Sequence, residues 1–208
     1  MPIADLTLDF NGERFEPEII REEIPLASGL TRYTGVVYKI THDGMSGSYI
    51  DLPGHIAETD DGLDAANFPL EQVYRVPAAV IRMNRKSGDG AVTAADLEKA
   101  WGGMPHTPAL IINALGDLDC RDIVSRSVYL DDSAVQWIID NHCRLLVSDI
   151  YESQALHGVF LKLFQAGVST VCRPYKLGQL PEKIVKLSVL FSKIPGVTQL
   201  PCRVVAEY

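Results

Sequence analysis

The sequence predicts an α/β fold, a single domain over residues 1–208 in which helices flank a mixed, largely buried β-sheet. Apolar runs of strand length are interleaved with segments of helical period. Most of these runs are apolar throughout rather than alternating, which is typical of strands covered on both faces. With 208 residues, 47% of them hydrophobic, the chain can bury a full core, and no repeat or linker divides it.

The expected strands follow one another along the chain. Residues 5–10 alternate polar and apolar side chains and predict a short first strand. Residues 11–32 are polar and predict a loop or a partly extended arm. A strand rich in Val, Ile and Tyr follows at 33–41 and leads into a turn at 42–44. The remaining predicted strands are 77–83, 109–115, 144–150, 168–172, 184–192 and 203–208.

Two helix starts carry capping signals. Thr93 is expected to cap a helix, with Asp96 in the reciprocal position of a capping box, and residues 102–103, both glycine, are expected to end it. Ser133 with Gln136 predicts a second capped helix in the same way. The intervening segment 116–131 is expected to be mostly loop.

The third predicted helix spans residues 153–165 and is closed by Gly167. In a helix of that length, His157 and Phe160 stand three residues apart and share a face.

Composition and charge exclude several classes of protein. The net charge of −8, without a basic cluster, disfavours a nucleic-acid partner, and no glycine-rich phosphate loop is present. There is no apolar run of 18 residues, so neither a transmembrane helix nor a membrane partner is expected. The first residues lack the basic and apolar regions of a signal peptide. The four cysteines are widely spaced, which indicates reduced thiols and a cytoplasmic protein.

The most informative stretch runs from Met45 to His55. If residues 45–51 are extended, Met45, Tyr49 and Asp51 point to the same face. A Pro-Gly turn at residues 53–54 then bends the chain, so that His55 can turn back toward Asp51. This arrangement predicts a carboxylate and an imidazole side by side.

The stretch resembles the signature of the cyclase family, the group that contains bacterial kynurenine formamidase and isatin hydrolase. The family pattern is H-x-G-T-H-x-D-x-P-x-H, and Ser48 here replaces its threonine. The positions that match are Gly47, Asp51, Pro53 and His55. Weaker similarity extends over nearly the whole chain, at residues 5–7, 68–71, 77–81, 135–149, 167–172, 180–181 and 201–206. The resemblance implies the family's swivelling β/β/α fold, a small and aromatic or cyclic substrate, and a homodimer or higher homo-oligomer.

The same resemblance implies five metal-binding positions, of which this chain keeps only Asp51. The other four positions hold Met45, Tyr49, Phe160 and Cys172. A thioether, a phenol and a phenyl ring are not the donors that zinc or manganese needs in a two-metal site. A binuclear site is therefore not expected here.

Two other uses of these residues remain open. Asp51, His55, His157 and Cys172 are permitted donors for a single rebuilt zinc or manganese site. Without a metal, His55 would act as general acid/base oriented by Asp51, with Tyr49 donating a hydrogen bond to an oxyanion. Ser48 or Cys172 would be the available nucleophiles. An Asp51–His55 contact could equally be structural and hold the Pro-Gly turn.

Two functions follow from these alternatives. The first is hydrolysis of a small amide, ester or lactone, an arylformamidase-like cleavage of a C–N bond, at a degenerate metal site. The second is a non-catalytic relative of the family that binds a small molecule or serves as an assembly partner.

Overall fold

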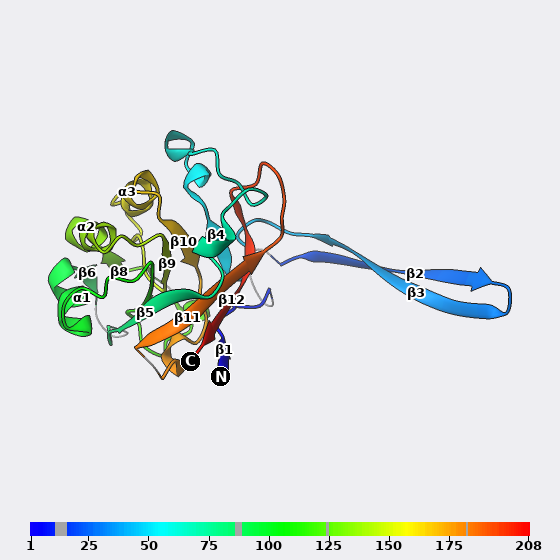
Figure 1. Cartoon of the computed structure of the whole chain (residues 1–208), viewed down its shortest axis with the longest axis horizontal. Helices are drawn as coiled ribbons and strands as arrows, with labels where there is room; N and C mark the ends of the chain where they lie inside the picture. The colour runs from blue at the N-terminus through cyan, green and yellow to red at the C-terminus, as the bar shows by residue number, and fades with distance from the viewer. Residues whose placement is uncertain (11–15, 86–88, 124, 182) are drawn as a thin grey trace.

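A mixed β-sheet forms the centre of the protein, as the computed structural model in Figure 1 shows. The structure describes residues 1–10, 16–85, 89–123, 125–181 and 183–208. Within these residues the sheet has eight strands, in the spatial order β1 (Ile3–Asp5), β12 (Gln199–Glu207), β11 (Ile184–Phe191), β5 (Val76–Arg82), β7 (Ala109–Asn113), β9 (Leu145–Ser148), β10 (Ser169–Cys172) and β4 (Tyr49–Asp51). The predicted α/β class is confirmed.

The sheet closes on itself through its three-residue strand β4. The neighbours β5, β7, β9 and β10 are parallel, as expected for strands joined by helical crossovers. Strand β4 runs antiparallel to β10 on one edge and to the first residues of β12 on the other. Because β12 also pairs with β11, the ring of strands is complete.

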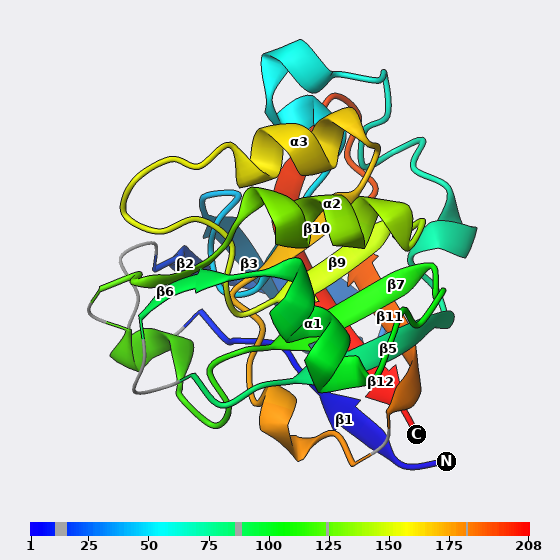
Figure 2. The ribbon, with the colours of Figure 1, turned by 90° about the vertical axis from the view of Figure 1, so that its left-hand side faces the viewer.

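Two apolar clusters stabilise this arrangement, one on each face of the sheet. The first includes Ile50, Ile111 and Val147, which come from strands around the ring and are fully buried. The second includes Leu110 and Leu146, on the opposite face, and is covered by helices. These helices are α1 (Ala94–Trp101), α2 (Asp132–Asp140) and α3 (Val159–Gln165), which lie side by side over the sheet in Figure 2.

The helix ends follow local chemistry, with two departures from prediction. The capping box of Thr93 and Asp96 is present. Helix α2, however, is capped by Asp131, whose carboxylate accepts from the backbone N–H of Ala134. Asp131 thus takes the role predicted for Ser133, since a carboxylate near a helix N-terminus also interacts favourably with the helix dipole.

The third helix is much shorter than predicted. It starts at Val159, because Gly158 adopts a left-handed conformation with a φ of +76° that interrupts helical geometry. His157 therefore lies in the preceding loop rather than on a helical face shared with Phe160.

Strands also form at positions where none was predicted. Strand β6 (Gly90–Val92) pairs in parallel with β8 (Val128–Leu130), which lies inside the predicted loop 116–131. Strand β12 begins at Gln199, four residues before the predicted start at 203. That early start matters, because it brings Gln199 beside β4.

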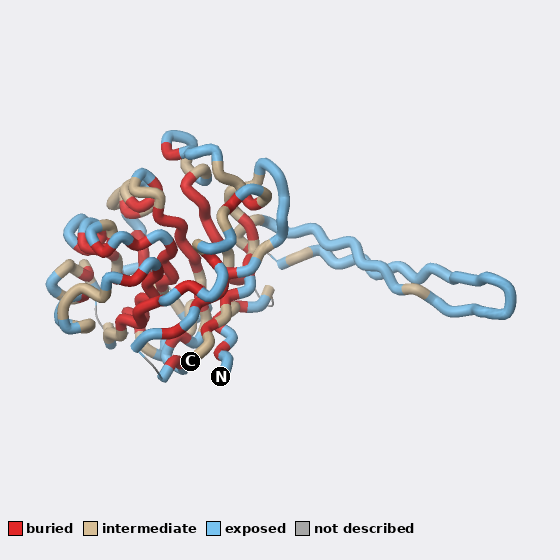
Figure 3. The backbone as a smooth tube through the Cα atoms, viewed as in Figure 1, coloured by how far each residue is buried: buried red, intermediate tan, exposed pale blue. Residues whose placement is uncertain are grey.

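A long hairpin projects from the body (Figure 1). It consists of β2 (Glu18–Ser28) and β3 (Thr31–Thr41), which pair in register along their full length. All its residues are exposed except Gly35, which is half-buried (Figure 3). The segment 11–32, predicted as loop or extended arm, thus contains a regular strand, although residues 11–15 lie outside the described residues. We refer to residues 18–41 as the arm.

Candidate active site

The candidate site is built on a three-strand ladder with β4 in the middle. In this ladder Asp51 lies opposite Thr170 of β10 and Gln199 of β12. Two residues earlier, Tyr49 lies opposite Cys172 in the same way. Since successive side chains alternate between the faces of a sheet, Asp51 and Tyr49 share one face, whereas Ile50 enters the apolar cluster on the other. The predicted shared face is therefore confirmed for Tyr49 and Asp51, but it does not extend to Met45, because residues 45–48 form turns and bends rather than extended strand.

Asp51 is buried, with 3% of its surface exposed, and both of its carboxylate oxygens have donors. Oδ1 accepts a hydrogen bond of 2.8 Å from the amide Nε2 of Gln199. Oδ2 accepts the thiol hydrogen of Cys172, at an Sγ–Oδ2 distance of 3.5 Å. A buried carboxylate therefore lies between a side-chain amide and a thiol.

Gln199 connects this carboxylate to the imidazole. Its Nε2 also lies 3.1 Å from Nε2 of His55. The amide group can donate one hydrogen to each partner only if Nε2 of His55 is unprotonated, which describes a neutral ring with its proton on Nδ1. The predicted pairing of Asp51 with His55 is thus made through a third residue. Gln199 is 144 residues from His55 in sequence, and the expected strand began after it, so no local signal pointed to it.

His55 itself is exposed, and the turn before it holds it in place. Pro53–His55 forms a short 3₁₀ turn, and the hydroxyl of Thr59 donates a 2.6 Å hydrogen bond to the carbonyl oxygen of Pro53. A Cβ atom on Gly54 would lie 2.9 Å from a methyl carbon of Thr198, so only glycine fits there. The Pro-Gly sequence is therefore required by packing as well as by the turn.

Burial and negative charge set the protonation of the groups around Asp51. Burial raises the pKa of Asp51 above its usual range, against the opposing effect of the hydrogen bond from Gln199. Burial and the neighbouring Asp51 charge raise the pKa of Cys172 well above that of a free thiol. Burial, with Cys172 and Asp51 nearby, likewise raises the pKa of the Tyr49 phenol. Both Cys172 and Tyr49 therefore keep their protons near neutral pH and are hydrogen-bond donors.

Neither of the two candidate nucleophiles is placed to react. Cys172 is a buried thiol rather than a thiolate, and only the thiolate is strongly nucleophilic. Ser48 is fully buried, and its hydroxyl donates to the carbonyl of Arg173 and accepts from the backbone N–H of Leu8, both at 2.7 Å. The structure therefore gives neither side chain both the exposure and the ionisation that a nucleophile needs.

The four residues considered for a single metal site, Asp51, His55, His157 and Cys172, do not come together as metal ligands. His157 stacks on Tyr129 with ring centroids 4.0 Å apart, and its Nε2 lies 2.8 Å from the Ser153 hydroxyl. Phe160 stacks on Tyr151 at 4.9 Å and packs into the helix-covered apolar cluster. Across the part of the chain that the structure describes, no three His, Cys, Asp or Glu side chains gather in a way that could hold an ion. The four-residue single-metal site considered from the sequence is therefore not assembled.

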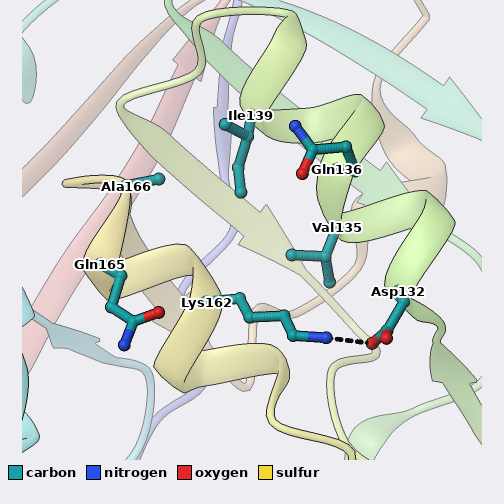
Figure 4. Close-up of a pocket in the computed structure, with 7 residues that line it drawn as sticks. All are labelled: Asp132, Val135, Gln136, Ile139, Lys162, Gln165 and Ala166. Carbon is teal, nitrogen blue, oxygen red and sulfur yellow. Dashed lines mark ion pairs between the residues drawn. The ribbon is translucent and has the colours of Figure 1, made fainter.

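A surface hollow of about 490 Å³ lies elsewhere, between α2 and α3. Its floor includes Val135 and Ile139, and an ion pair between Lys162 and Asp132 spans one end (Figure 4). It includes none of the residues of the Asp51 ladder. No helix among the described residues has both the length and the apolar character needed to cross a bilayer.

Comparison with solved structures identifies the fold. Isatin hydrolase A from Ralstonia solanacearum superimposes with a TM-score of 0.74 at 18% identity, over 99% of this chain and 91% of that one. A predicted metal-dependent hydrolase from Bacillus stearothermophilus gives 0.67 at 18% identity, over 99% and 97%. A structure described as a novel cyclase gives 0.75 at 17% identity, over 100% and 88%. At such identities the likeness defines the architecture.

The family follows from the sequence itself. Residues 4–154 match the family model Cyclase, described as "Putative cyclase". This match covers most of the chain and includes the stretch from Met45 to His55. The chain therefore belongs to the cyclase family, and the resemblance on which its fold was predicted is confirmed. No curated protein matches the chain significantly.

Proposed function

We propose that this protein hydrolyses a small amide, ester or lactone by general acid/base catalysis at His55. The observation that carries the proposal is the amide of Gln199, which contacts both the buried Asp51 carboxylate and the exposed His55 ring. A hydrolase-like function also agrees with the family and with the hydrolases among its structural relatives.

In the proposed reaction a water molecule is the nucleophile. Nε2 of His55 exchanges its contact with Gln199 for this water and takes a proton as the water oxygen attacks the carbonyl carbon. The imidazolium that forms is stabilised by the nearby Asp51 charge. His55 then returns the proton to the departing nitrogen or oxygen, which gives an acid and an amine or alcohol. Tyr49, which keeps its proton, donates to the oxyanion.

The surroundings favour a small aromatic or cyclic substrate. Tyr49 and Phe160 pack into one apolar cluster beside Cys172, where the family pattern has metal ligands. Apolar and aromatic walls with a few polar groups are the usual lining of a small-molecule site. The proposal includes no metal ion, because Tyr49 and Phe160 are not suitable ligands and the Cys172 thiol, whose pKa is raised by burial, keeps its proton. The free cysteines support a cytoplasmic location.

The test is a pair of matched substitutions. Purified protein is assayed against N-formyl aromatic amines, aryl esters and small lactones, with its metal content measured by elemental analysis. His55→Asn should lower kcat/KM by a factor of about 10² to 10⁴, the usual contribution of a general acid/base. His142→Asn is the control, since His142 is exposed and lines a small hollow that includes none of these groups. Equal activity in the two variants would refute the role of His55.

A second candidate function is supported by the packing. Apolar or weakly coordinating side chains occupy the family's ligand positions, and the surface hollow of about 490 Å³ lies elsewhere. A non-catalytic relative that binds a small molecule would show this combination. Such a protein would be recognised by ligands that raise its melting temperature without being turned over. The same ligands would raise the melting temperature of the His55→Asn variant by the same amount. Turnover that is lost in His55→Asn would exclude it.

A further inference from the structure

A serine and a histidine meet outside the Asp51 ladder, in the loop that leads into α3. The Oγ atom of Ser153 lies 2.8 Å from Nε2 of His157. A hydroxyl within hydrogen-bond distance of an imidazole is the pairing of a nucleophile with its general base. We propose that Ser153 and His157 form a second reactive site, at which Ser153 takes the acyl group of an activated ester. This site shares no residue with the one proposed around His55.

Two contacts hold His157 in place. Its ring stacks on that of Tyr129, with the centroids 4.0 Å apart and an angle of 3° between the planes. Its backbone N–H donates a 2.6 Å hydrogen bond to the carboxylate of Glu152. That carboxylate is buried and also accepts the N–H of Val159 at 2.8 Å, so its own position is fixed. A base that is already oriented needs little further ordering when it takes a proton.

The hydroxyl of Ser153 is arranged to give its proton to this base. Its Oγ accepts a hydrogen bond of 3.0 Å from the backbone N–H of Ala155, and that donor stabilises negative charge that develops on the oxygen. The carbonyl oxygen of Ala155 lies 3.2 Å away, so the nearer acceptor for the hydroxyl hydrogen is His157. This arrangement places the ring proton on Nδ1. Ser48, in contrast, donates to a backbone carbonyl, which cannot take up a proton.

Both side chains are within reach of a substrate, because Ser153 and His157 are partly exposed. Leu156 lies between them in sequence and is 91% exposed, so it offers an apolar surface to the organic part of an ester. The loop keeps a defined shape, since the backbone N–H of Gln154 donates to the carbonyl oxygen of Arg126 at 3.2 Å. An open pair beside one apolar side chain favours a small ester with a short acyl group and an aromatic leaving group.

The proposed reaction has two stages. First, Oγ of Ser153 bonds to the carbonyl carbon of the ester while Nε2 of His157 takes the hydroxyl proton. The bond from that carbon to the phenol oxygen then breaks, and His157 returns the proton to this oxygen. A phenol leaves, and the acyl group remains on Ser153 as an ester. In the second stage a water molecule, deprotonated by His157, hydrolyses this ester and restores the serine.

The test treats the intact chain with phenylmethylsulfonyl fluoride, whose ester with a serine is stable and therefore accumulates. Peptide mapping by mass spectrometry should find the sulfonyl group on Ser153, formed about 10² times more slowly, or slower still, in His157→Asn. Ser133 is the matched control within the same chain. Its exposed hydroxyl also accepts a backbone N–H, but it donates to the Asp131 carboxylate instead of an imidazole. No adduct on Ser153, or equal labelling of Ser133, would overturn the proposal.

Further variants separate this site from His55 and remain decisive if His157→Asn does not fold. Ser153 should be labelled at an unchanged rate in His55→Asn, whereas a rate that falls with His55 would show that the two sites are one. In the Ser153→Cys variant the new thiol should be alkylated by iodoacetamide about 10-fold faster than the thiol of Ser133→Cys, because an imidazole favours the thiolate and a carboxylate does not. Equal alkylation rates would contradict the pairing.

Discussion

Strands β3 and β4 are consecutive in sequence, separated only by residues 42–48, yet they meet opposite environments. In β3 every residue is exposed except Gly35, although the strand is long and rich in Val, Ile and Tyr. In β4, which has three residues, Ile50 and Asp51 are buried. The longer strand, which has more apolar side chains in number, is in solvent, and the shorter one, which contains a carboxylate, is in the core.

The difference lies in the edges of the two strands. Strand β4 has a partner on each edge, β10 and β12, so Ile50 packs into the apolar cluster on one face and Tyr49 packs against the helix-covered cluster on the other. Strand β3 has only β2. Composition made both segments strands, but pairing decided which one is buried and which is available to another molecule.

Removing one buried side chain from β4 gives the largest expected effect. Ile50→Ala should lower the free energy of unfolding by about 3–4 kcal/mol, because Ile50 is fully buried and leaves a cavity. Ile40→Ala on β3, where the side chain is 57% exposed, should change the stability of the monomer by about 0.5 kcal/mol at most. Urea unfolding at low protein concentration measures both, and similar losses would show that the arm is part of the monomer core.

The next effect is a dependence of stability on pH that comes from buried carboxyls of the body. Burial raises the pKa of Asp149 to about 6, against hydrogen bonds from the backbone N–H groups of Leu115 and Ala114, and the pKa of Asp51 is also raised. Between the ordinary Asp value of 3.8 and about 6, the folded state binds more protons than the unfolded state. Stability should therefore fall by about 2 kcal/mol as pH rises from about 4.5 to 7.5.

Urea unfolding at the two pH values measures this change. Asp149→Asn does not ionise and keeps an oxygen for only one of the two N–H groups, so it should reduce the slope while it lowers the overall stability. Aspartates with lowered pKa values, such as Asp64 and Asp96, lose their contribution only below this window. Stability that rises over the same pH range would contradict the prediction.

A smaller effect tests the bridging amide. Gln199→Leu removes a donor from a buried carboxylate and should lower the free energy of unfolding by about 1–2 kcal/mol at pH 7.5. The loss should be less at pH 4.5, because Asp51, with its raised pKa, is then more often neutral. If Gln199 also positions His55, kcat should fall with little change in KM. A loss that does not depend on pH would show that Gln199 contributes only packing.

The smallest expected effect is on the arm. Lys39 and Glu22 form an ion pair of 2.8 Å, but both side chains are about half exposed or more. Lys39→Ala should change the stability of the monomer by less than about 0.5 kcal/mol, since exposed ion pairs contribute little. A change above about 1 kcal/mol in unfolding measurements would indicate that the arm is held more firmly than its exposure suggests.

Local patterns predicted most elements of the fold. The apolar runs at 109–115 and 168–172 form β7 and β10, and the capping box at Thr93 starts α1. Such signals act within a few residues, through backbone geometry and side-chain periodicity. They were misleading where a single residue overrode the pattern, as Gly158 does at the start of α3.

The sequence by itself determined that β4 carries Asp51, that a Pro-Gly turn separates it from His55, and that three of the family's other four ligand positions hold residues that bind no metal well. Only the tertiary structure decided that Gln199, 148 residues after Asp51, joins the two. It also separated His157 from the site and left the arm in solvent. The physical reason is that strand pairing between distant segments chooses which side chains meet, and spacing along the chain does not encode that choice.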